Sequence, residues 1–282
     1  MFFYNVKVFS LEVYKSKLRR RINTLLIPYL IWNALALLEI AIKQLPVFSS
    51  LFPNIGIYHW NVRFLMDAFW CMPDGSCPIY YPFWYIRDLM VCVWLSPLLY
   101  WLIKRIGIFW LLALLVGILF QVKTLSGFGL SSIFFFSIGA FWSVFYQQEW
   151  TRFHLLGIGV VLWIPFAILY TCTGDYYFHF VSILCGVCTA LFIGSVAVNK
   201  YGFKMPRSLI KSVFFVYATH AFVLPYVSKM LFMVLPCSNE VLCGLLLIVI
   251  LIITVLLCLV LYNILNRFAP KLCGILIGGR KK

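Results

Sequence analysis

The chain has 282 residues, of which 64% are hydrophobic and only 11% are charged. Soluble domains carry about 25% charged residues, so this composition excludes a soluble globular protein and indicates one embedded in a membrane. The 23 Lys and Arg residues outnumber the 8 Asp and Glu residues, which gives a net charge of +15. In a soluble chain such an excess would suggest nucleic-acid binding, but here it must first be compared with the membrane topology.

Apolar runs long enough to cross a bilayer recur along the chain, each bounded by charged or turn-forming residues. They predict eight membrane-spanning helices, at residues 25–42, 83–103, 106–122, 130–146, 154–172, 179–198, 213–235 and 244–264. Neither side of the membrane has a loop long enough for a soluble catalytic domain. The sequence therefore predicts an all-α transmembrane bundle that forms one membrane-embedded domain over residues 1–282.

The basic residues are unevenly distributed between the predicted loops. If the N-terminus lies in the cytoplasm, the outer segments hold only Lys43, Arg63 and Lys123. Because Lys and Arg favour cytoplasmic loops, we predict a multi-pass protein of the inner membrane with both termini in the cytoplasm. This placement explains most of the positive charge, and we predict contact with membrane lipids and no nucleic-acid partner.

Two segments outside the spans have distinct characters. The first twenty-one residues end in the basic run 15–21, and they are read either as the end of a preceding helix or as an interfacial amphipathic segment. The longest outer segment, 44–82, mixes aromatic residues with prolines and is predicted to be a partly helical lid in the outer interface.

The ten cysteines and four histidines give no metal-binding motif. Cys71 and Cys77 share one outer loop, as do Cys237 and Cys243, and each pair is a possible disulfide. The pair Cys185 and Cys188 lies inside an apolar helix, where small side chains at helical spacing indicate helix packing.

Two ionisable residues, Arg87 and Asp88, lie inside a predicted span just after the aromatic residue Trp84. Charged groups are costly in hydrocarbon, so at least one of them is expected to meet a partner in the protein interior or in a wet cavity. Because adjacent residues of a helix point in different directions, we expect the two side chains to diverge.

His220 lies about seven residues into a span that starts near Val213, hence roughly 10 Å deep. Tyr217 precedes it by three residues on the same helical face. One reading is a hydrogen-bonded packing residue. The other is a general base for an alcohol that attacks an activated ester, since the pKa of a free histidine is near 6.5.

Several strings together resemble the acyltransferase 3 family of integral-membrane acyltransferases. They are KLRRRI at 17–22, LLIPYLIW at 25–32, FWYIRDL at 83–89, LSPL at 95–98, FFVYATH at 214–220, and the ending RFAP at 267–270 with GGR at 278–280. The resemblance spans essentially the whole chain. It implies about ten helices and transfer of acyl groups, commonly acetyl from acetyl-CoA, to sugars of surface glycans or exported saccharides.

Family members carry an N-terminal helix with an Arg and, ten residues later, a His that is taken as catalytic. Met1 of this chain falls after that helix, so His220 does not inherit the role of that histidine. We expect in-frame sequence upstream of Met1 to encode the helix; the alternatives are a degenerate gene product or helices supplied from elsewhere.

The resemblance also suggests where the donor binds. The cluster Lys17, Arg19, Arg20 and Arg21 can bind the phosphates of acyl-CoA, although the same charges also serve as topology signals. Acyl-CoA (acetyl-CoA) is then a co-substrate, and no bound cofactor or metal is expected.

On the outer side, Trp84, Arg87 and Asp88 are the predicted contacts of a saccharide or glycan hydroxyl, with His220 and Tyr217 as the predicted catalytic residues. Two other functions fit the same charges and aromatics: a flippase or permease for a lipid-linked saccharide, or an inactive remnant of the family.

Overall fold

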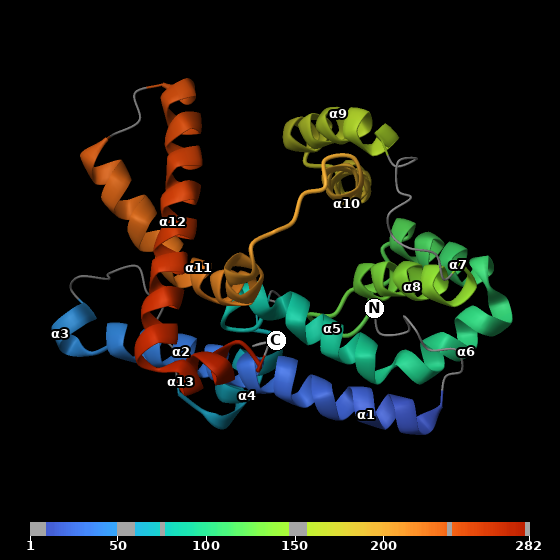
Figure 1. Ribbon diagram of the computed structural model, residues 1–282, viewed down its shortest axis with the longest axis horizontal. Helices are drawn as coiled ribbons and strands as arrows, with labels where there is room; N and C mark the ends of the chain where they lie inside the picture. The colour runs from blue at the N-terminus through green and yellow to red at the C-terminus, as the bar shows by residue number, and fades with distance from the viewer. Residues whose placement is uncertain (1–9, 50–59, 74–76, 147–156, 236–238, 280–282) are drawn as a thin grey trace.

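The computed structural model describes residues 10–49, 60–73, 77–146, 157–235 and 239–279, where every regular element is helical (Figure 1). The elements are α1 (Leu11–Arg21), η1 (Ile22–Leu26), α2 (Ile27–Lys43), α3 (Pro46–Ser49), α4 (Val62–Trp70), η2 (Tyr81–Phe83), α5 (Trp84–Trp94), α6 (Ser96–Ile106), α7 (Ile108–Leu119), α8 (Leu130–Phe145), α9 (Ile158–Thr173), α10 (Tyr176–Asn199), α11 (Arg207–Val234), α12 (Glu240–Phe268) and α13 (Pro270–Leu276).

The all-α transmembrane prediction is confirmed, while the count of eight spans is approximate. In the described part of the chain, four helices are long and apolar enough to cross a membrane: the continuous helix Leu11–Lys43, α10, α11 and α12. The bent pair α5 and α6 is a fifth candidate. The other three predicted spans coincide with the shorter apolar helices α7, α8 and α9, which have 10–17 residues.

The helix that carries the first span begins well before the predicted residue 25. Ser10 caps α1 by accepting a 3.3 Å hydrogen bond from the Val13 amide, and the π-helical turn η1 joins α1 to α2 without a break. The resulting 33-residue helix is about 50 Å long, whereas the hydrocarbon core of a bilayer is about 30 Å thick. The basic helix α1 therefore has the length to project beyond the hydrocarbon.

The helix pair α5 and α6 is bent by 65° at Leu95. Pro97 follows two residues later and explains the bend. Proline lacks the N–H that would bond to the Val93 carbonyl, and its ring clashes with that carbonyl in a straight helix. The predicted span 83–103 is thus two helices, of which α5 contacts both α1 and η1.

Helices α9 and α10 form a tightly packed hairpin (Figure 1). A Cβ atom on Gly159 of α9 would lie 2.7 Å from the Cβ of Cys188 and 3.0 Å from the carbonyl oxygen of Cys185. Both cysteines are thiols. The packing role predicted for Cys185 and Cys188 is confirmed, because small residues let the two backbones approach.

The outer segment is partly helical, as predicted, since it contains α4. Asn61 caps this helix by accepting a 2.7 Å hydrogen bond from the Phe64 amide. Cys71 and Cys77 remain thiols, so the disulfide considered for them is not formed, although the Met72 amide does bond to the Cys77 carbonyl at 3.1 Å.

The second cysteine pair lies partly outside the described residues. Cys243, near the start of α12, is disulfide-bonded. Cys237, the partner considered for it, is not among the residues that the structure describes.

An aromatic core joins α2, η2, α11 and α13. Trp32 packs against Tyr80 and Phe215 with ring centroids 6.4 and 6.0 Å apart. The buried Asn33 accepts a 3.2 Å hydrogen bond from the Tyr80 amide. Burial raises the pKa of the Tyr80 phenol, so its hydroxyl stays protonated and donates to the Ala218 carbonyl at 2.5 Å.

The C-terminal helix α13 docks on this core through backbone contacts. The Trp32 indole donates to the Leu276 carbonyl at 3.2 Å. Gly278, at a φ of +68°, lies against the backbone of Thr24, and a Cβ atom there would be 2.7 Å from the Thr24 oxygen. At position 278 the backbone of Thr24 therefore leaves no room for any residue larger than glycine.

We expect Gly278→Ala to lower the free energy of unfolding by roughly 2 to 5 kcal/mol. The positive φ costs a Cβ-bearing residue about 1 to 2 kcal/mol, and overpacking adds about 1 to 3 kcal/mol. Gly279→Ala is the matched control, because Gly279 has a φ of +67° but open space around it. Thermal unfolding of both purified variants would measure the difference, and equal losses would contradict the steric explanation.

Candidate active site

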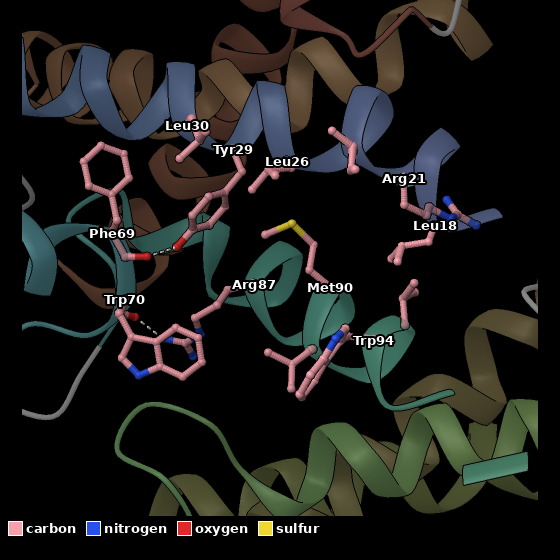
Figure 2. Close-up of a pocket in the computed structure, with 13 residues that line it drawn as sticks. Leu18, Arg21, Leu26, Tyr29, Leu30, Phe69, Trp70, Arg87, Met90 and Trp94 are labelled. Carbon is pink, nitrogen blue, oxygen red and sulfur yellow. Dashed lines mark hydrogen bonds between the residues drawn. The ribbon is translucent and has the colours of Figure 1, made fainter. Parts of the chain in front are cut away.

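A cavity of about 420 Å³ lies between the N-terminal helix and α5 (Figure 2). Its wall comes from the first helix, from the end of α4 and from one face of α5. The lining residues are Leu18, Arg21, Ile22, Leu26, Tyr29, Leu30, Phe69, Trp70, Arg87, Met90, Val91, Val93 and Trp94.

An arginine marks each end of this mostly apolar cavity. Figure 2 shows Arg21 beside Leu18 at one end, and Arg87 beside Trp70 at the other. Arg21 comes from the basic run of α1, one turn after Leu18, so helical spacing places both on the face that lines the cavity. The cavity thus extends from the basic helix to the interior charge pair of α5.

Arg87 and Asp88 form a buried ion pair. Their exposed fractions are 3% and 4%, and the Nε and Nη2 atoms of Arg87 each lie 2.9 Å from Oδ1 of Asp88. The expectation of an interior partner is confirmed, but the expected divergence of the two side chains is wrong. The long arginine stem folds back to the neighbouring carboxylate because an unpaired buried charge would be far more costly.

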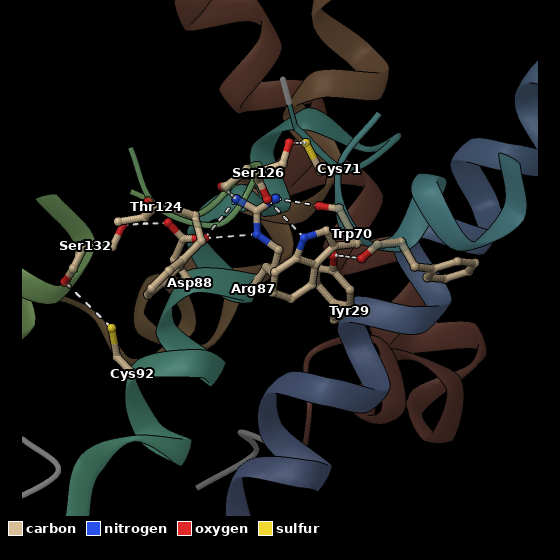
Figure 3. Close-up of polar contacts among 12 residues, drawn as sticks. Tyr29, Trp70, Cys71, Arg87, Asp88, Cys92, Thr124, Ser126 and Ser132 are labelled. Carbon is tan, nitrogen blue, oxygen red and sulfur yellow. Dashed lines mark hydrogen bonds and ion pairs between the residues drawn. The ribbon is translucent and has the colours of Figure 1, made fainter. Parts of the chain in front are cut away.

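The same pair ties three chain segments together (Figure 3). Arg87 donates from Nη1 to the Trp70 carbonyl at 2.5 Å and from Nη2 to the Gly127 carbonyl. Ser132, at the start of α8, donates from its hydroxyl to Oδ2 of Asp88 at 2.5 Å. Among the described residues, one N–H of Nη1 remains uncommitted.

Gly127, in the loop between α7 and α8, permits this arrangement. Its φ is +81°, and a Cβ atom would lie 2.8 Å from Nη1 of Arg87 and 2.8 Å from the Cβ of Cys71. Only glycine combines that backbone conformation with so close an approach. The loop carbonyl can therefore reach a guanidinium that belongs to a distant helix.

Trp70 is held at the end of the cavity by two contacts. Its indole N–H donates to the Ser126 carbonyl at 3.0 Å, and the Cζ atom of Arg87 lies 5.4 Å from the ring centroid. The neighbouring Phe69 carbonyl accepts a 2.5 Å hydrogen bond from Tyr29, which also lines the cavity. Sequence reasoning missed Trp70 as a site residue, because it placed all aromatics of the outer segment at the lipid interface.

His220 and Tyr217 lie on α11 and contact each other through the backbone. Nδ1 of His220 is 2.6 Å from the Tyr217 carbonyl oxygen. A carbonyl oxygen can only accept, so Nδ1 is the ring nitrogen that donates here; in the tautomer with one ring proton, Nε2 has the lone pair. Nε2 makes no hydrogen bond with any residue that the structure describes.

Tyr217 connects α11 to the turn that precedes α5. Its hydroxyl donates to the Pro82 carbonyl, and its ring stacks on Phe83 with centroids 5.8 Å apart. The turn η2 leads directly into α5, which carries Arg87. The predicted catalytic pair is therefore joined to the charge pair through η2, although neither His220 nor Tyr217 lines the cavity.

Most of the other predicted site residues lie outside the cavity. Of the basic cluster, only Arg21 lines the cavity, while Arg19 and Arg20 are exposed and Lys17 is half-buried. Trp84 is 44% exposed beside Tyr85 and does not line the cavity. Within the described residues, no cluster of three or more His, Cys, Asp or Glu side chains could hold a metal ion.

Comparison with protein families agrees with the motifs. The acyltransferase 3 family model, described as an acyltransferase domain, matches residues 1–263. No curated protein and no solved structure matches this chain. Because the family model covers most of the sequence, and the apolar helices agree with it, the chain belongs to the acyltransferase 3 family and is a membrane acyltransferase.

Proposed function

We propose that this acyltransferase moves an acyl group, commonly acetyl, from a cytoplasmic acyl-CoA to a hydroxyl of a saccharide or surface glycan. The observation that carries the proposal is the cavity that runs from Arg21 of the basic helix to Arg87 of the buried pair. Such a path would connect a charged donor on one side of the membrane with an acceptor on the other. The proposed orientation places both termini in the cytoplasm of the inner membrane.

The donor end of the path has the chemistry that coenzyme A requires. Its phosphates are recognised by forked, charge-assisted donors, which Arg19, Arg20 and Arg21 supply together with Lys17. Arg21 would hold the donor at the cavity mouth. The apolar wall beyond it would receive the acyl end and keep water from the thioester.

The transfer itself needs a base. The acceptor oxygen attacks the thioester carbonyl carbon, the carbon–sulfur bond breaks, and the new ester forms. The hydroxyl proton passes through the base to the leaving thiolate. We assign the base to Nε2 of His220, whose lone pair is available, with Tyr217 fixing the ring through its carbonyl.

The acceptor end lies at Arg87 and Asp88, with Trp84 exposed at the start of α5. The uncommitted N–H of Arg87 would donate to an acceptor hydroxyl or to the carbonyl oxygen of the thioester. His220 does not line the cavity. To meet His220, the acceptor hydroxyl must therefore extend from Arg87 past the turn η2, where Tyr217 contacts Pro82 and Phe83.

Calorimetry with acetyl-CoA tests the donor site. We expect the triple variant Arg19→Gln, Arg20→Gln, Arg21→Gln to bind acetyl-CoA about tenfold to a hundredfold more weakly. This is the loss that follows from removing one charge-assisted hydrogen bond, which contributes about 1.5 to 3 kcal/mol to binding. Arg21→Gln alone should account for most of the loss, because exposed Arg19 and Arg20 are screened by solvent.

The matched control removes three charges elsewhere on the predicted cytoplasmic side, by Lys15→Gln, Lys104→Gln and Arg105→Gln. These exposed residues do not line the cavity. Unchanged binding in the first triple variant, or equal losses in both, would reduce the arginines to topology signals and contradict the donor site.

A further inference from the structure

We propose that Trp70 is the platform on which the saccharide acceptor stacks, at the outer end of the cavity. This inference rests on the proposed function, because it takes the acceptor to be a saccharide. It goes further in naming a binding residue that lies in the lid segment and not at the start of α5. The argument depends on the position, orientation and chemical surroundings of the indole ring.

Trp70 lies between the surface of the protein and the cavity. The side chain is 39% exposed, yet it also lines the cavity at the end opposite Arg21 (Figure 2). A molecule that stacks on Trp70 from outside would therefore lie next to the space proposed for the acyl end. Trp84 is similarly exposed, at 44%, but does not line the cavity.

The orientation of the Trp70 ring is fixed before any ligand binds. The bond from its indole N–H to the Ser126 carbonyl holds the edge of the ring, and the guanidinium of Arg87 lies over one face (Figure 3). The side chain is 39% exposed, so part of the ring is left to meet a ligand. A ring fixed in this way loses little rotational freedom on binding.

The surroundings of Trp70 match the two kinds of surface that a pyranose presents. One face of the sugar ring consists of C–H bonds, which favour the negative face of an aromatic system. Its rim consists of hydroxyls, which need both donors and acceptors. The uncommitted N–H of Arg87 is a donor beside Trp70, and the backbone carbonyl of Trp70 is an acceptor there.

Saturation-transfer NMR with methyl glycosides tests the site without requiring catalysis. The probes are the methyl glycosides of glucose, galactose, rhamnose and N-acetylglucosamine, added to the full chain in nanodiscs. We expect at least one to bind, and Trp70→Leu to raise its Kd about tenfold, the order expected for losing one stacking contact. Trp70→Phe should lose less, because it keeps an aromatic face.

Trp60→Leu is the matched control. Trp60 is also in the outer segment, is 46% exposed, and donates its indole N–H to Gln44 at 3.0 Å, but it does not line the cavity. The control should leave the glycoside Kd within twofold of wild type. Thermal unfolding of each variant would confirm that Trp70→Leu still folds, and Trp70→Phe provides the second measurement if it does not.

The outcomes separate this inference from the proposed function. Acetyl-CoA binding by the same samples tests the donor site alone and should not change in Trp70→Leu. If acetyl-CoA binds but no glycoside does, or if Trp84→Leu weakens glycoside binding while Trp70→Leu does not, the platform is overturned and the donor site stands. If glycosides bind through Trp70 but acetyl-CoA does not bind, the proposed acyl transfer fails instead.

Discussion

Replacing His220 with alanine should lower kcat for acyl transfer by a factor of about 10² to 10⁴, the usual contribution of a general base. The structure leaves Nε2 with its lone pair because Nδ1 donates to the Tyr217 carbonyl at 2.6 Å. The affinity for acyl-CoA should stay within twofold of wild type, since the base acts on the reacting groups and not on the bound donor. Mass spectrometry of the acylated saccharide would give kcat, and calorimetry would give the donor affinity.

Two further variants distinguish a base from a packing residue. His220→Gln keeps a hydrogen-bonding side chain of similar length but cannot take a proton, so it should be as slow as His220→Ala. His179→Ala is the matched control, since His179 is also half-buried and packs on Tyr170 with ring centroids 4.4 Å apart. Recovery of turnover in His220→Gln would assign His220 to packing.

The apolar runs of the sequence were sufficient to predict the helical fold, because a backbone in lipid must satisfy its hydrogen bonds internally. They did not predict where the first helix starts. The run 15–21 is too basic to be read as a span, but Lys, Leu and Arg are good helix formers, so the helix extends back to Leu11. Helical propensity and membrane burial are separate properties, so a basic segment can continue a membrane helix without being part of its span.

The candidate site was only partly predictable, because its key contacts involve backbone carbonyls. Arg87 was identified from its charge, since a buried arginine needs partners. Two of these partners are the carbonyls of Trp70 and Gly127, and a carbonyl has no side-chain signature in the sequence. Trp70 was therefore not distinguished from other outer aromatics, whereas Trp84 was selected as an aromatic residue close to Arg87 along the chain.

The second large effect is expected at Asp88. Asp88→Ala would leave the guanidinium of Arg87 buried with no carboxylate, and breaking one side of a buried pair costs about 3 to 5 kcal/mol of folding stability. The loss should also release the Ser132 hydroxyl, which now donates to Oδ2 of Asp88. The free energy of unfolding, measured by denaturant titration in detergent, would give the magnitude.

Asp67→Ala is the control, because Asp67 pairs at 3.9 Å with the exposed Arg63, and surface pairs contribute only about 0 to 1 kcal/mol. The double variant Arg87→Met, Asp88→Leu should recover much of the stability lost in Asp88→Ala, since it removes the unpaired charge together with its partner. It should still bind the acceptor more weakly than wild type, because the N–H donor of Arg87 beside Trp70 is then lost. If Asp88→Ala were as mild as Asp67→Ala, water would have to reach Arg87, and the end of the cavity would be wet and open to solvent.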